Sequence, residues 1–150
     1  MTDQDFMSEL ERALARPDAD KLARQIDIYI EHMKGGDGEW PDEISDDLNE
    51  VLMSGNDDPD KALAYVVIAA ARTDDDSFLG FMGAGPLEDA LERPNKEFLD
   101  RIVDEARRSK RFRWMLSVPY REAVSDDTWY AIKDLATYDT RIKRLPPRDV

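Results

Sequence analysis

The sequence predicts an all-α protein, and three observations support this prediction. Apolar residues recur mostly at the spacing of three and four that places them on one face of a helix. No run shows the alternation of β-branched residues, bounded by turns, that indicates a strand. Glycine, proline and aspartate mark helix ends at short intervals. We therefore expect an irregular bundle of seven or eight helices. A short stack of helix pairs of the HEAT type is the alternative, although no repeat of fixed period is evident.

Four helices are expected in the first half of the chain. They cover about residues 3–15, 18–34 and 42–53, and a fourth starts at Asp58-Pro59-Asp60, where an aspartate can cap free amides and proline suits the first helical position. We expect Asp18 to cap the second helix and Ser54-Gly55-Asn56 to end the third. Because residues 62–71 are apolar on nearly all sides, the fourth helix should lie at the centre of the protein.

The second half of the sequence predicts four further helices and a tail. Asp74, Asp75 and Asp76 are expected at the start of a helix that ends near residue 82. Gly83-Ala84-Gly85-Pro86 should interrupt that helix before a turn over 87–91. Further helices are expected over about 95–109 and 110–118, and another follows a cap at Ser125. The chain length fits one helical domain over residues 1–150, with a flexible or partner-bound tail from about residue 139.

Charge and composition restrict the class of protein. The formal net charge is −13; residues 1–100 hold 26 acidic and 9 basic residues, whereas residues 101–150 hold 8 acidic and 12 basic ones. Such a surface repels nucleic acid over most of the molecule and favours a basic partner. The chain has no cysteine and its first residues are acidic, so we expect a cytoplasmic protein. Its longest apolar run is about half of the roughly 20 residues that a membrane span needs.

Residues 80–91 form the most distinctive segment, because two glycines precede a proline and two acidic residues. A glycine-rich turn at a helix start can bind phosphate through its amides. Here the strand and the Lys-Ser or Lys-Thr pair of a phosphate loop are missing, and Glu88 and Asp89 would repel an anion. We interpret the segment as a tight corner between two helices, with Pro86 at the first helical position and Glu88 closing the cap.

The motif Gly83-Ala84-Gly85-Pro86-Leu87-Glu88-Asp89, together with the downstream segments 105–108 and 111–114, resembles a family of small bacterial helical proteins of unknown function. The similarity covers roughly residues 58–116. It implies a helical fold and a bacterial source, and it transfers no activity and no functional residues.

No catalytic, cofactor-binding or metal-binding residues are predicted, and we expect a protein that is not an enzyme. His32 is the only histidine and has no evident nucleophile partner, so we interpret it as structural. The acidic runs at 46–50 and 74–76 lack the ligand spacing of a calcium loop. A carboxylate-dependent metal enzyme is therefore the last of our three hypotheses. We expect Trp40, Trp114 and Trp129 to serve in packing.

The basic run at 107–113 supports a second hypothesis, a small regulatory protein that contacts nucleic acid. It holds five cationic residues, yet such residues also suit a helix C-terminus and ion pairs within an acidic fold. Contact with nucleic acid is therefore the less favoured interpretation.

The first hypothesis is a non-enzymatic protein-binding module of the immunity-protein or inhibitor type. Its acidic helical edge would meet a basic partner, with attraction at long range speeding association. The residues expected to line this edge are Asp42, Glu43, Asp46, Asp47, Glu50, Asp57, Asp58 and Asp60. Neither the identity of the partner nor the oligomeric state is predicted.

Overall fold

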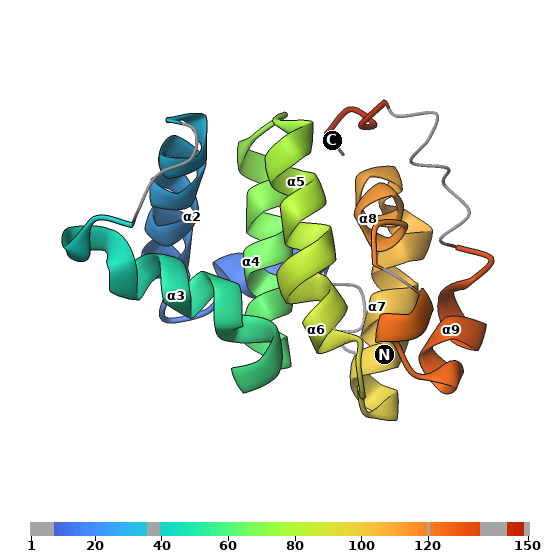
Figure 1. The fold of residues 1–150 in the computed structure, drawn as a ribbon. Helices are drawn as coiled ribbons and strands as arrows, with labels where there is room; N and C mark the ends of the chain where they lie inside the picture. The colour runs from blue at the N-terminus through green and yellow to red at the C-terminus, as the bar shows by residue number, and fades with distance from the viewer. Residues whose placement is uncertain (1–7, 36–39, 120, 136–143, 149–150) are drawn as a thin grey trace.

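The computed structural model is an all-α fold, as the sequence predicts, and it describes residues 8–35, 40–119, 121–135 and 144–148 (Figure 1). No strand occurs in these residues. The elements are α1 (Glu9–Leu14), α2 (Ala19–Lys34), α3 (Asp42–Asp57), α4 (Pro59–Arg72), α5 (Asp76–Met82), the π-helical turn η2 (Gly83–Leu87), α6 (Glu88–Ala90), α7 (Lys96–Arg108), α8 (Lys110–Leu116), the 3₁₀ turn η3 (Arg121–Ala123) and α9 (Asp126–Ile132).

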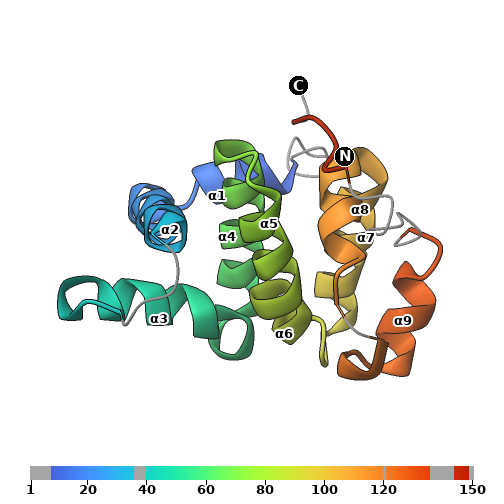
Figure 2. The ribbon, with the colours of Figure 1, turned by 45° about the horizontal axis from the view of Figure 1, so that its top comes forward.

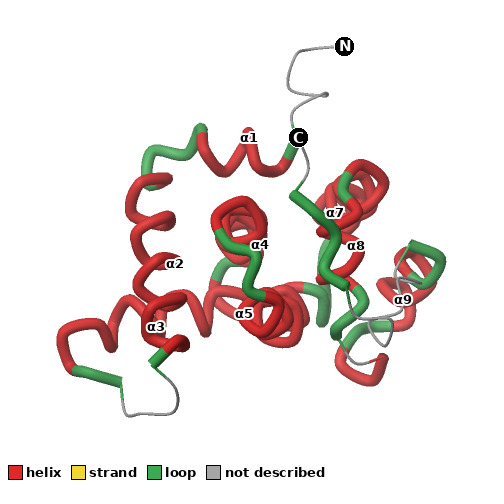
Figure 3. The backbone as a smooth tube through the Cα atoms, turned by 90° about the horizontal axis from the view of Figure 1, so that it is seen from above, coloured by secondary structure: helices red, strands yellow, loops and turns green. Residues whose placement is uncertain are grey.

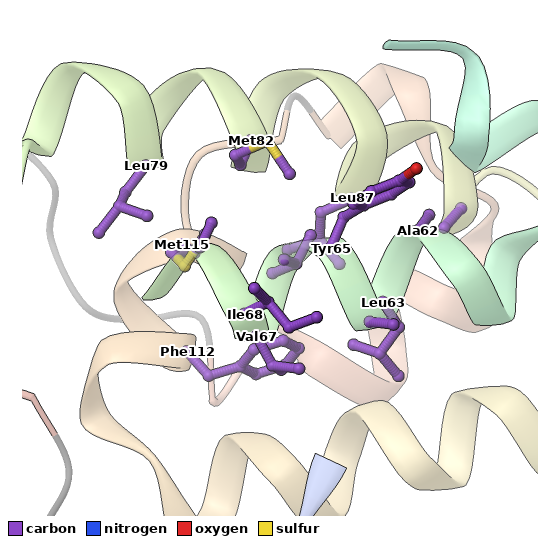
Figure 4. Close-up of a cluster of buried hydrophobic side chains, with 14 of the residues drawn as sticks. Ala62, Leu63, Tyr65, Val67, Ile68, Leu79, Met82, Leu87, Phe112 and Met115 are labelled. Carbon is purple, nitrogen blue, oxygen red and sulfur yellow. The ribbon is translucent and has the colours of Figure 1, made fainter. Parts of the chain in front are cut away.

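Helix α4 lies at the centre of the bundle, which confirms the prediction from its apolar sequence. Helices α1, α2, α3, α5, α6 and α8 all contact it, and Figures 2 and 3 show the others arranged around it. Its residues 62–69 are all buried. In Figure 4, Ile68 of α4 belongs to one buried cluster with Met115 of α8 and Leu79 of α5. In a stack of repeats each pair would contact only its neighbours, so these contacts favour the irregular bundle.

The predicted end of the third helix at 54–56 is wrong, because α3 continues through Gly55 to Asp57. Gly55 is buried where α3 meets the turn before α6. A Cβ atom at this position would lie 2.4 Å from the carbonyl oxygen of Pro86 and 2.5 Å from the Cβ of Asp89. Glycine is therefore required here for a close approach between two helices, and its role is not that of a helix stop.

The predicted interruption at 83–86 is also wrong, because residues 76–90 form one continuous helical run. The Gly-Ala-Gly-Pro stretch adopts a π turn, with Pro86 inside the helix. Proline has no amide proton and its ring crowds the preceding turn, so a local widening of the helix accommodates it. Gly83 is needed for packing, since a Cβ there would lie 2.6 Å from the carbonyl oxygen of Met115 in α8. Pro86 therefore does not occupy a first helical position, and Glu88 continues the helix.

The helix starts agree with the predicted ones at several positions, including Asp42 of α3, and differ at two. Side chains of Asp58, Asp75 and Ser125 accept hydrogen bonds from amides of the first turns of α4, α5 and α9, as expected. The first helix begins at Glu9, because Ser8 and Glu11 form a capping box there; the predicted residues 3–7 lie outside the described residues. Asp18 does not cap α2, because its carboxylate binds Arg16 instead. At the third helix, Pro41 precedes Asp42 and no side chain caps the first turn.

The C-terminal segment 144–148 has no regular secondary structure and lies against the bundle, with Pro146 buried. The Nε of Arg111 donates to the carbonyl oxygen of Pro146 over 3.0 Å, and Arg148 pairs with Asp74. The other residues of the predicted tail, 139–143 and 149–150, lie outside the described residues. Within the described part of the chain, no helix is long and apolar enough to cross a membrane.

Candidate protein-binding surface

The outer face of α3 carries an acidic stripe, which we define as Asp42, Asp46, Asn49, Met53 and Asp57. These residues follow one another at intervals of three and four, so they lie on one side of the helix. All five are exposed, and Figure 1 shows α3 on the outside of the bundle, across the lower ends of α2 and α4. Met53, which is 38% exposed, is the apolar residue of the stripe and lies between Asn49 and Asp57.

The carboxylates of the acidic stripe have no cationic partner among the described residues. Asp42, Asp46 and Asp57 make no ion pair or side-chain hydrogen bond with any residue that the structure describes, and the same holds for Glu43, which is exposed beside the stripe. Four of the eight predicted partner-binding residues therefore present free negative charge to solvent. At physiological salt such charges act over about 8 Å, which is enough to orient an approaching basic surface.

Glu50 belongs to a network of hydrogen bonds within the chain and is only partly exposed. Its carboxylate accepts hydrogen bonds from Lys61 of α4 over 2.8 Å, from Lys21 of α2 over 3.3 Å and from Gln25 of α2 over 3.0 Å. The Lys61 hydrogen bond, followed by that from Gln25, lowers the pKa of Glu50 from its usual 4.5 to about 2. Glu50 therefore stays ionised and joins α3 to two neighbouring helices.

Gln25 is the buried centre of the same network. It is fully buried, and its side-chain NH₂ donates to Asp47 as well as to Glu50, over 3.0 Å in each case. Its side-chain oxygen accepts a close hydrogen bond from the hydroxyl of Tyr65, which is also fully buried and lies 3.2 Å from Oε2 of Glu50. Burial and the negative charge of Glu50 raise the pKa of Tyr65, so the hydroxyl remains a donor. Asp47 is thus bound within the chain and is only partly exposed.

Asp58 and Asp60 are also engaged within the chain. Asp58 caps α4 by accepting from the amide of Lys61 over 3.2 Å. Asp60 binds Arg16 over 2.8 Å and Arg101 over 2.6 Å, and so joins the start of α4 to the end of α1 and to α7. The structure therefore separates the predicted edge into two groups: the exposed, unpaired Asp42, Glu43, Asp46 and Asp57, and the internally paired Asp47, Glu50, Asp58 and Asp60.

Sequence reasoning missed Gln25 and Tyr65, which belong to the network that engages Asp47 and Glu50, and it missed Met53 of the stripe. Gln25 and Tyr65 give no signal of a shared network, because 40 positions separate them and each also fits an ordinary helix face. Met53 of the stripe could have been found from helical spacing, since it lies seven positions after Asp46 and eleven after Asp42.

Part of the basic run at 107–113 makes contacts within the fold. Arg111 is buried, and its guanidinium donates to the carbonyl oxygens of Ala70 and Thr73 at the end of α4 and to Asp74. Arg113 donates to the carbonyl oxygen of Ala106 over 2.7 Å. Only Arg107, Arg108 and Lys110 of the five are exposed, which leaves a smaller positive surface for nucleic acid than the sequence indicates.

The features weighed for metal or catalytic chemistry take structural positions. Asp75 caps α5 and Asp74 pairs with Arg111 and Arg148, while Asp76 lies in the first turn. Across the described residues, no group of histidine and acidic side chains could hold a metal ion. His32 lies partly buried in the last turn of α2. Trp114 is buried, and the other two tryptophans pack against the core, as predicted.

Comparison with known proteins identifies the family and no function. A family of unknown function, DUF6869, matches residues 37–140, a region that contains α3 to α9 and the 83–89 motif. Searches of curated proteins and of solved structures find no match to the chain. A family of unknown function is thus shown, as expected, while the 83–89 motif as a mark of the family and a bacterial source stay predictions. Because the match covers more than half of the sequence, the chain belongs to DUF6869.

Proposed function

We propose that the protein is a non-enzymatic binding module whose acidic stripe on α3 meets a basic protein partner. The observation that carries this proposal is the contrast within α3. Carboxylates on its inner side are bound by lysines and Gln25, whereas those of the stripe have no cation among the described residues. Unpaired like charges along one helix repel one another, and a cationic surface would relieve that repulsion.

The partner should present cationic side chains around an apolar contact. Met53 lies between the acidic residues of the stripe, and its thioether adapts readily to a partner surface. Charged residues around such a contact mainly speed association and select the partner, while the desolvated centre supplies affinity. A module of the immunity-protein or inhibitor type, which covers the cationic site of a toxin or enzyme in the cytoplasm, would have these properties.

Charge reversal tests the proposal with a matched control. The stripe variant carries Asp42→Lys, Asp46→Lys and Asp57→Lys. The control variant carries Glu92→Lys, Glu97→Lys and Asp127→Lys, all exposed and outside α3. Both variants have the same net charge; the stripe variant places one lysine in the first turn of a helix, and the control places two.

The measurement is an affinity pull-down from native cytoplasm with the two variants and the unmodified chain, each washed at low and at high salt. We expect the unmodified chain and the control variant to retain a basic protein at low salt. The stripe variant should not retain it. After purification, this basic protein should associate with the stripe variant at least about tenfold more slowly than with the unmodified chain. Equal capture by both variants, or recovery of nucleic acid alone, would contradict the proposal.

A further inference from the structure

A cavity of about 430 Å³ lies where α1, the end of α4 and the α7–α8 junction meet, at the opposite side of α4 from α3. We name it the α1–α8 pocket. Its apolar wall consists of Leu10, Val67, Ala70, Ala71 and Phe112. Figure 3 shows the surrounding elements, with the C-terminal segment passing beside α7 and α8. The volume is within the range of about 300–1,000 Å³ that is typical of sites for small molecules.

Positively charged side chains outnumber negatively charged ones in this pocket, although the protein as a whole is strongly acidic. Three arginines and two glutamates line it. One of the two, Glu105, already accepts a hydrogen bond from the amide of Glu9 over 3.2 Å. The other, Glu11, accepts one from the amide of Ser8 over 3.4 Å within the capping box of α1. The carboxylate of Glu11 thus belongs to the start of α1, and that of Glu105 joins α7 to the same helix start.

Arg148 supplies cationic donors at the rim. Its Nε donates to Asp74 over 3.0 Å, which fixes the guanidinium, while its two Nη atoms have no partner among the described residues. Its side chain is 47% exposed, so a ligand can reach it from solvent. Arg111 holds this arrangement in place, because it binds both Asp74 and the backbone of the C-terminal segment. A fixed guanidinium with free Nη atoms suits a carboxylate or sulfonate.

We propose that the α1–α8 pocket binds a small organic monoanion. The apolar body of the ligand, about the size of a two-ring aromatic, lies against Val67, Ala71 and Phe112, and its single anionic group is bound by Arg148. This site is separate from the acidic stripe and does not depend on the proposed function. Burial of the apolar body supplies most of the affinity, and the arginine selects for negative charge.

Two fluorescent probes test both parts of the proposal on the full chain. One is 8-anilino-1-naphthalenesulfonate, and the other is N-phenyl-1-naphthylamine, which has the same rings without the sulfonate. We expect saturable binding of both at one site per chain, with the anionic probe bound more tightly. Unfolding must remain cooperative under the same conditions, because such probes also bind partly unfolded proteins.

Four variants locate the site. Ala71→Phe, which fills the pocket, should abolish the binding of both probes, whereas the matched Ala123→Phe, outside the pocket, should leave it unchanged. Arg148→Ala should weaken the anionic probe about fivefold to tenfold and leave the neutral probe unchanged. Arg144→Ala, which removes the same charge from the same segment without lining the pocket, should affect neither probe.

A measurement on the unmodified chain keeps the proposal testable if a variant does not fold. Amide resonances of Val67, Ala71 and Phe112 should shift on titration with the anionic probe. The proposed binding site would be contradicted if the folded chain showed no saturable binding, or if the resonance shifts were confined to other regions. Equal weakening of both probes by Arg148→Ala would overturn the role assigned to this arginine.

Discussion

Replacement of Glu50 by glutamine should destabilise the protein at neutral pH, by an amount that the structure allows us to calculate. The pKa of Glu50 is lowered from 4.5 to about 2 by Lys61, Gln25 and Lys21. A shift of this size corresponds to about 3 kcal/mol if no solvent screens the charge. The side chain is 32% exposed, however, and screening reduces the expected contribution to about 1–2 kcal/mol. Glu50→Gln should therefore lower the free energy of unfolding by this amount at pH 7.

The pH dependence separates this electrostatic contribution from a loss of packing. A carboxylate with a lowered pKa stabilises the folded state fully above its unfolded pKa, near 4.5, and the stabilisation is lost as the pH falls toward about 2. The stability difference between the unmodified chain and Glu50→Gln should therefore be constant from pH 7 to about 5 and should shrink below that. Urea unfolding at several pH values measures it.

Glu43→Gln is the control, because Glu43 is an exposed glutamate of the same helix without an ion pair in the described chain. It should have no effect beyond about 0.5 kcal/mol. A Glu50→Gln penalty that is the same at pH 7 and at pH 3 would refute the electrostatic origin. No penalty at pH 7 would refute the network itself.

Three further changes test other parts of the structure by thermal or urea unfolding. Gly55→Ala should cost about 2 kcal/mol or more, because its new Cβ would lie 2.4 Å from the carbonyl oxygen of Pro86; stability like that of the unmodified chain would contradict the close helix approach. Burial and the negative charge of Glu88 raise the pKa of Asp89, so Asp89→Asn should raise stability at neutral pH and this gain should disappear in acid; a loss at pH 7 would be the opposite result. Arg111→Met should cost about 2–4 kcal/mol, since it leaves buried carbonyl oxygens without a donor, and a neutral outcome would show that water replaces it.

The helical fold and its central helix were predictable because they depend on local rules. Residues 62–71 are too apolar to form an amphipathic helix, so a position surrounded by neighbours follows from the sequence. The caps at Asp58, Asp75 and Ser125 were predictable for the same reason, since the capping residue and the amides it binds are at most three positions apart.

The errors at Gly55 and Pro86 have a common physical origin. Both residues were interpreted as helix breakers, which is their local tendency. In the structure, Gly55 of one helix contacts the backbone at Pro86 of another, and the second helix widens into a π turn. The contact depends on two segments about 30 positions apart, so it cannot be predicted from the tendencies of neighbouring residues alone.

The same limit applies to the acidic edge, and the geometry of α3 explains it. Asp46 and Glu50 are equivalent by charge and are one turn apart, yet their positions around the helix axis differ by about 40°. This rotation directs Glu50 toward the lysines of α2 and α4, whereas Asp46 remains in the exposed stripe. The sequence locates the acidic residues, but only the packing of neighbouring helices decides which of them keep an unpaired charge. A partner can bind the stripe without breaking any ion pair of the described residues, whereas binding through Glu50 would disrupt the network that joins three helices. For this reason, charge reversal at Asp42, Asp46 and Asp57 reports on binding, and reversal at Glu50 reports first on folding.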